Sequence, residues 1–198
     1  PAVTLTFLRL GKVRAIDALW YVVAQTAGAV AGVALSYAVL GRALAHPATH
    51  FVVTAPGADG VRTAFFAELG ISALLMTTVL VLSSTRWASH TGLVCGGLVA
   101  AYITFEAPLS GMSMNPARTL GSAIVAGDFH ALWIYLCAPP LGMLAAAELS
   151  RVDEARLRPA VAAVLADLRG RQIHAESREG VVVPSGHYDA SHGVAVRA

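Results

Sequence analysis

Long apolar stretches separated by short polar links fill most of the chain as far as Ser150. A helix rises 1.5 Å per residue, so about 20 apolar residues cross the hydrocarbon core of a bilayer. Four stretches reach or approach that length: 18–40, 64–83, 92–105 and 131–147. The third becomes long enough when Thr91 and its neighbours are included. The pattern predicts an all-α membrane protein with four spanning helices.

Two further apolar segments, 1–10 and 116–126, are too short to span. Each would form about 15 Å of helix, half of a hydrocarbon core. Each begins with proline, the favoured first helical residue, and Asn115 stands at the cap position of the second. Lipid cannot satisfy the backbone at such helix ends, so they must be buried in protein or line a watery cavity. We expect two re-entrant half-helices.

The two short segments share a sequence. Pro-Ala-Val-Thr-Leu at 1–5 matches Pro-Ala-Arg-Thr-Leu at 116–120, and Ala-Leu-Trp follows each at a similar distance. Arg9, Lys12 and Arg14 precede the first span and an Arg-rich tail follows the fourth, which places both ends in the cytoplasm. The half-helices would then enter from opposite faces. Inverted repeats with broken helices are typical of channels and transporters.

The composition agrees with a membrane protein and excludes other classes. Only 13% of residues are charged and 56% are hydrophobic, whereas soluble domains carry about 25% charged residues. No basic patch with interleaved aromatics indicates nucleic acid. Cys95 and Cys137 make neither a disulfide framework nor a metal site. His50, His130 and the other histidines before Ser150 fall in loops or at span ends, so we expect no cofactor, no metal and no enzyme activity.

Few charged side chains fall inside the predicted spans. Glu68 is the only charge within 64–83, and an unpaired carboxylate at that depth would be costly. Asp17 and Glu106 lie near span ends, where we expect them to reach water.

The composition of the chain changes after Ser150, where the long apolar stretches end. This change suggests a channel domain at 1–150 and a cytoplasmic tail at 151–198. Residues 151–168 could form a short amphipathic helix, and Gly, Ser, His and Pro dominate from Gly170 onward, which predicts disorder. The tail is either a solvated extension or, through its arginines, a contact with a regulator or with anionic lipid.

These motifs resemble those of the major intrinsic protein family, the aquaporins and aquaglyceroporins. The resemblance covers Pro1 to about Ser150 and rests on the repeated segment and on Ser-Gly-Met-Ser-Met-Asn-Pro-Ala-Arg-Thr at 110–119. It implies a bundle of six spans and two half-helices, usually a homotetramer with one pore per subunit, in contact with lipid in the cell membrane. On that pattern the first two spans and the first motif's asparagine are missing, so we expect a fragment.

The resemblance also implies site residues. The pore motif would comprise Asn115, Pro116, Ala117, Pro1 and Ala2. Arg118, Ile103 and Met112 would line the narrow outer constriction, whereas Glu68 and Gln25 would support the re-entrant loops. Donors on Asn115 and two positive helix ends would orient water and oppose cations. The alternatives are capping alone for Asn115, a purely structural Arg118 and a proton relay at Glu68.

Some residues that distinguish water channels from glycerol facilitators in the family point to one class and some to the other. Ile103 stands where water-specific members carry histidine, and Leu136 is typical of glycerol facilitators. Thr119, Ala123 and Tyr135 are typical of water channels. We expect a passive channel for water and other small uncharged solutes that excludes ions and protons. A glycerol-type facilitator is the alternative, and a secondary transporter is disfavoured because only one carboxylate lies deep.

Overall fold

The computed structural model describes residues 1–152 and 166–167. The chain divides into two units, Pro1–Asp153 and Glu154–Ala198, and the second contributes only residues 166–167 to the described part. The expected disordered tail and most of the expected amphipathic helix at 151–168 therefore lie outside the described residues.

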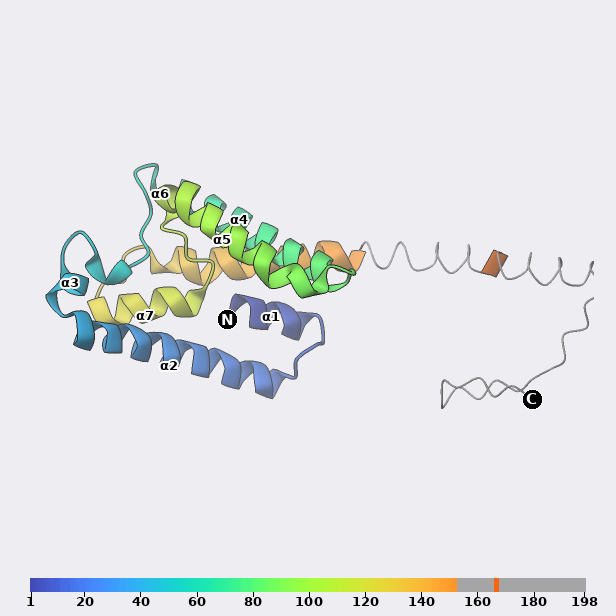
Figure 1. Cartoon of the computed structure of the whole chain (residues 1–198), viewed down its shortest axis with the longest axis horizontal. Helices are drawn as coiled ribbons and strands as arrows, with labels where there is room; N and C mark the ends of the chain where they lie inside the picture. The colour runs from blue at the N-terminus through green and yellow to red at the C-terminus, as the bar shows by residue number, and fades with distance from the viewer. Residues whose placement is uncertain (153–165, 168–198) are drawn as a thin grey trace, which may run out of the picture. The chain divides into compact units, whose positions relative to one another are not determined.

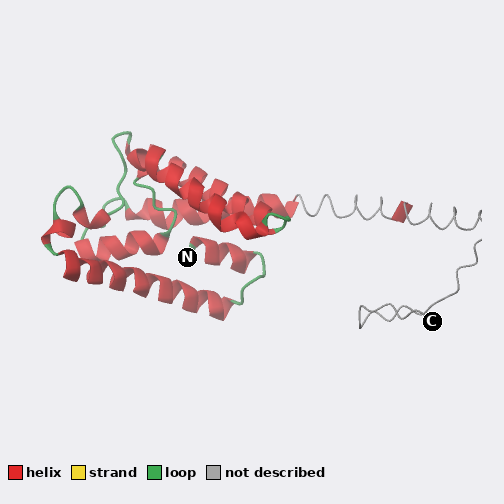
Figure 2. Ribbon diagram, viewed as in Figure 1, coloured by secondary structure: helices red, strands yellow, loops and turns green. Residues whose placement is uncertain are grey.

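Every regular element in the described part of Pro1–Asp153 is helical (Figure 2). In chain order the elements are α1 (Ala2–Arg9), α2 (Ala15–Leu40), α3 (Arg42–Ala45), η1 (His50–Val52), α4 (Gly60–Ser83), η2 (Ala88–His90), α5 (Thr91–Phe105), α6 (Ala107–Ser110) and α7 (Pro116–Ala126). A last helix, Leu132–Val152, follows α7 and is called the fourth span below.

Four of the described helices are long and apolar enough to cross a membrane: Ala15–Leu40, Gly60–Ser83, Ala88–Phe105 and Leu132–Val152. They confirm the four predicted spans, although their ends differ from the predicted ones. Arg14 donates two hydrogen bonds to Asp17 in the first turn of α2, where a negative side chain stabilises the helix. The fourth span continues past its apolar residues to Val152, and Glu148 and Arg151, one turn apart, form an ion pair there.

The two half-helices lie within the bundle. Figure 1 shows α1 and α7 lying roughly end to end beside α2, and both contact α2. Gly121 allows α7 to approach α2 closely, since a Cβ there would lie 2.8 Å from the carbonyl carbon of Ala29. Gly142 plays the same part between the fourth span and α4, where a Cβ would lie 2.3 Å from the carbonyl oxygen of Leu69. Such small residues let membrane helices pack backbone to backbone.

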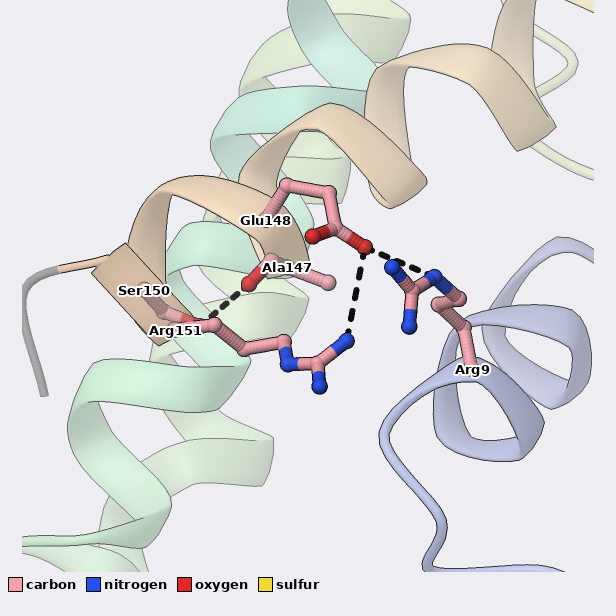
Figure 3. A network of polar contacts seen from close by, with 5 residues as sticks. All are labelled: Arg9, Ala147, Glu148, Ser150 and Arg151. Carbon is pink, nitrogen blue, oxygen red and sulfur yellow. Dashed lines mark hydrogen bonds and ion pairs between the residues drawn. The ribbon is translucent and has the colours of Figure 1, made fainter. Parts of the chain in front are cut away.

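One ion pair ties the end of α1 to the fourth span, and a second, within that span, shares its carboxylate (Figure 3). Arg9 Nε lies 2.8 Å from Glu148 Oε1, and Arg151 Nη1 lies 3.7 Å from the same oxygen. Ser150 Oγ donates to the carbonyl of Ala147 beside them. All three charged side chains are about half exposed, so each pair contributes on the order of 0–1 kcal/mol.

Candidate functional site

A cavity of about 800 Å³ lies where the starts of α1 and α7 meet. The sequence-predicted residues on its wall are Pro1, Ala2, Gln25, Ile103, Met112, Asn115 and Arg118. Pro116 and Ala117 are buried in the first turn of α7, and Glu68 is buried on α4 outside the cavity lining. The structure thus brings two repeats more than a hundred residues apart in the sequence to one cavity.

Asn115 caps α7 and also faces the cavity. Its backbone is extended, with φ −147°, and its Oδ1 accepts a hydrogen bond of 3.0 Å from the N–H of Ala117. The oxygen is therefore engaged by the helix, which leaves the two N–H donors of the side chain for the cavity. Capping and a role at the cavity are compatible in this geometry.

Glu68 is fully buried and accepts three hydrogen bonds from the loop before α7. The Ser110 hydroxyl donates at 3.0 Å, the N–H of Met114 donates at 2.8 Å, and the N–H of Ser113 donates to the same oxygen as Ser110. Met112 and Met114 have φ of +50° and +52°, a region that residues other than glycine seldom adopt. The carboxylate therefore holds a loop whose conformation needs support.

Tyr135 supports the same loop from the fourth span. Its hydroxyl donates a 2.6 Å hydrogen bond to the carbonyl of Ser110, and its side chain is fully buried. Sequence reasoning used Tyr135 only as a solute marker. No periodic pattern distinguishes this tyrosine from its apolar neighbours on the span.

A chain of buried hydroxyls runs behind the cavity wall. Arg118 Nη1 donates to Thr54 Oγ1, which lies 3.2 Å from Thr119 Oγ1. Thr119 Oγ1 lies 2.5 Å from Ser113 Oγ, and Ser113 Oγ donates to the carbonyl of Asn115 at 3.1 Å. Sequence reasoning named Thr119 only as a solute marker and Ser113 only within the 110–119 motif, and it missed Thr54, because the loop carrying Thr54 shows no motif.

Gln25 connects the first spanning helix to the first half-helix. Its Nε2 donates a 3.1 Å hydrogen bond to Thr4 Oγ1 on α1, and Gln25 also lines the cavity. Thr6 Oγ1 bonds back to the carbonyl of Ala2 within α1.

The expectation that Glu106 reaches water is wrong. Glu106 is only 8% exposed, and neither of its carboxylate oxygens has a hydrogen-bond partner among the described residues. The chain turns directly from α5 into α6 at this position, which folds the side chain inward. Asp17, by contrast, is partly exposed and paired with Arg14.

The described residues contain no cluster of three or more His, Cys, Asp and Glu side chains able to hold a metal. The chemistry that the cavity offers is hydrogen bonding and charge. Donors from Asn115 and Arg118 stand against apolar walls that include Ile103.

Spanning helices around two half-helices that meet at a partly polar cavity are the architecture of a membrane channel or transporter. Residues 1–149 match the family described as Major intrinsic protein, and the chain belongs to that family of channels.

The chain is similar to both branches of this family. It is 37% identical to aquaporin NIP3-1 of Zea mays over 159 residues, which cover 79% of this chain and 51% of that protein. It is 35% identical to the glycerol uptake facilitator protein-like 6 of Lactiplantibacillus plantarum, covering 77% of this chain and 72% of that protein. The chain spans about half the length of the plant relatives it matches.

A solved structure shows the same fold. The aquaglyceroporin from Plasmodium falciparum superposes with a TM-score of 0.64, covering 74% of this chain and 68% of that chain at 22% identity. The expected aquaporin-like helical bundle is thereby confirmed.

Proposed function

We propose that this chain provides the pore of a passive channel for water and other small uncharged solutes in the cell membrane, and that the pore excludes ions and protons. The observation that carries the proposal is the shared cavity of Pro1, Asn115 and Arg118, where both half-helices begin.

The electrostatics of this cavity favour neutral solutes. Each helix N-terminus carries about +0.5 elementary charge, so two of them and the Arg118 guanidinium make the cavity positive. Water entering it would direct its oxygen toward the donors of Asn115, and cations would meet a barrier. Glu68 is engaged with the loop by three hydrogen bonds, which supports a scaffold role rather than a proton relay.

The cavity wall supports permeation of more than water. Ile103, Met112 and Val99 contribute apolar surface to the cavity that the polar groups also line, which suits a solute with one hydrocarbon side and one hydroxyl side. Met112 is flexible and could adapt to such solutes. Relatives include both an aquaporin and a glycerol uptake facilitator by name, so a glycerol-type facilitator is the second candidate.

Assembly into a homotetramer is part of the proposal. Large apolar side chains of α2 and α5 are exposed, among them Leu19, Trp20 and Leu93. Lipid and neighbouring copies of the chain are the partners suited to such surfaces.

Solute flux tests the proposal directly. The product of the complete coding sequence would be reconstituted in liposomes, and shrinkage after osmotic challenge would be followed by stopped-flow light scattering. We expect water and glycerol permeability above that of protein-free liposomes, with no dependence on ion gradients. Flux that follows an ion gradient would instead indicate a secondary transporter, and no added permeability would contradict the proposal.

Asn115→Asp should increase cation leakage by more than about tenfold. Aspartate can keep the capping bond to Ala117, but it replaces two donors by a negative charge, which contributes about 4 kcal/mol to a cation 4 Å away at an effective dielectric of 20. A fluorescent sodium or proton indicator inside the liposomes measures the leak. Asn115→Ser, which caps without a charge, is the control, and equal leakage in the two variants would contradict the assignment.

A further inference from the structure

We propose that Glu106 is a buried proton-binding site that locks the loop at residues 111–114, and that loss of the proton releases this loop. The loop forms part of the cavity wall. The proposal rests on the proposed channel function only for its consequence, which is control of the pore by pH.

Glu106 has no partner for a negative charge. It is 8% exposed, and neither carboxylate oxygen accepts a hydrogen bond among the described residues. The Tyr102 hydroxyl, one turn earlier in α5, is buried and lacks a partner as well, so it does not donate to Glu106. The Ser110 hydroxyl donates to Glu68 at 3.0 Å. An isolated carboxylate away from water is so costly that the group binds a proton instead.

The titratable groups around Glu106 do not favour its charged form. Glu68 on α4 lies close enough to act on its charge, and Glu106 in turn acts on Tyr102 of α5 and Tyr135 of the fourth span. The guanidinium of Arg118 on α7 interacts with Glu68 and Tyr135 instead. None of the groups that interact with Glu106 in this way is a cation.

Burial raises the pKa of Glu106. The nearby Ser110 hydroxyl opposes this shift, and the negative charge of Glu68 adds to it, as expected for two carboxyl groups in one apolar region. The loop before α4, whose Gly57 N–H donates to α6, has Asp59 as its charged residue, and Asp59 is exposed. Packing and charge therefore both favour the protonated form.

Glu106 begins the turn that leads into the loop. Its backbone carbonyl accepts hydrogen bonds from the N–H groups of Leu109 and Ser110, at 2.8 and 3.4 Å. Ala107 and Gly111, at the two ends of this turn, line the cavity. The position of the Glu106 side chain is thus coupled through the backbone to the cavity wall.

Ionisation should draw the side chain out of its site. Glu106 is the first residue after the spanning helix that ends at Phe105, and Figure 1 shows α6 at the same end of the bundle as α3. A short displacement therefore brings the carboxylate to water, where its charge is hydrated. The turn at Ala107 would move with it, and the loop would lose its fixed position.

Infrared spectroscopy tests the proton site, because a protonated carboxylic acid shows a carbonyl band that carboxylates lack. An exposed glutamate, with a pKa of about 4.3, is almost wholly ionised at pH 6. In the product of the complete coding sequence, we expect the protonated fraction of Glu106 at pH 6 to exceed that of an exposed glutamate by about tenfold or more.

Two variants assign the band. Glu106→Gln should remove it, whereas Glu148→Gln should keep it, because Glu148 is about half exposed and pairs with Arg9 and Arg151. A parent protein without the band at pH 6, or a band that survives in Glu106→Gln, would overturn the proton site.

Amide exchange tests the coupling to the loop. The N–H of Gly111 donates to the carbonyl of Ala107 at 2.8 Å, and the N–H of Met112 donates to the Ser110 hydroxyl at 3.0 Å. At pH 8 these two amides should exchange about tenfold faster in the parent protein than in Glu106→Gln, and at pH 5 the two proteins should agree within about twofold. Equal exchange at both pH values would overturn the coupling.

Neither measurement requires transport. A parent protein that conducts nothing would therefore contradict the proposed function, while the infrared band and the amide exchange would still decide whether Glu106 binds a proton and locks the loop.

Discussion

At the scale of single residues, the site depends on buried polar side chains. Each forms hydrogen bonds with the loop whose conformation it supports. Glu68 can stay buried in an apolar bundle because one hydroxyl and two backbone N–H groups donate to it. Such charge-assisted bonds are stronger than neutral ones. The same bonds satisfy loop N–H groups that lipid could not.

Glu68→Gln should destabilise the protein by about 2–4 kcal/mol, since the amide turns a donor toward groups that are themselves donors. A lower thermal unfolding temperature in detergent measures the effect. Glu148→Gln is the matched control, because that carboxylate is about half exposed and, among the described residues, pairs with Arg9 and Arg151. Equal shifts in both variants would contradict the support role.

The sequence allowed some of these residues to be predicted and not others. Asn115, Arg118 and Glu68 are identifiable as polar residues in apolar or repeated surroundings. Thr54 belongs to a loop without periodicity, and only the tertiary fold brings it to Arg118. We expected the Glu106 side chain to reach water, because hydropathy locates the end of a span. Hydropathy does not give the direction of the turn that follows.

At the scale of elements, the spans were predictable and their ends were not. Spans follow from apolar runs of sufficient length. Ends depend on local pairs, such as Arg14 with Asp17 at the start of α2. The half-helices were predictable from the repeat, whereas α3, η1 and α6 were not, because helices this short leave no pattern.

Gly121→Ala should separate α7 from α2 and lower the unfolding temperature in detergent. The added Cβ would lie 2.8 Å from a backbone atom of Ala29, which cannot move aside alone, and overpacking of this kind costs about 1–3 kcal/mol. Gly70→Ala, also in a helix but with nothing within 4 Å of the added Cβ, is the control. It should be neutral or stabilising. A neutral Gly121→Ala would show that the two helices pack differently.

Acid should release the loop at residues 50–54. Hydrogen bonds from the backbone N–H of His130 and then from His50 lower the pKa of Asp128. A lowered pKa gives stabilisation that is complete above the unfolded value of about 3.9 and is lost as the pH falls through the folded value. Amide exchange of this loop, corrected for its intrinsic pH dependence, should stay protected at pH 5–7 and become fast below about pH 4.

Asp128→Asn supplies the control for that titration. The variant loses the titrating group, so its loop should already exchange faster at pH 7 and gain little more at pH 4. A loop that stays protected in acid would show that the contact between Asp128 and His50 does not anchor it.

At the scale of the whole molecule, basic residues are more numerous at one end of the spanning unit than at the other. The loop after α1 and the end of the fourth span lie at one end in Figure 1, and α3 lies at the other. Arg9 and Arg151 mark the first end, which the positive-inside rule assigns to the cytoplasm.

Cysteine labelling tests this orientation. With Cys95 and Cys137 replaced by alanine, a cysteine at Asp128 should react with an impermeant maleimide added to intact cells, and a cysteine at Lys12 should react only after the cells are opened. Both native positions carry free thiols, so they must be removed first. The reverse labelling pattern would invert the proposed topology.

The hydroxyl chain behind Arg118 has a fixed sense. A guanidinium can only give protons and a carbonyl oxygen can only take them, so the two termini leave one ordering: Thr54 gives to Thr119, Thr119 to Ser113, and Ser113 to the carbonyl of Asn115. Each group thereby polarises the next. The Arg118 guanidinium and the Asn115 carbonyl consequently belong to one aligned row of dipoles, and replacing the hydroxyl of Thr119 by a methyl group would interrupt that row.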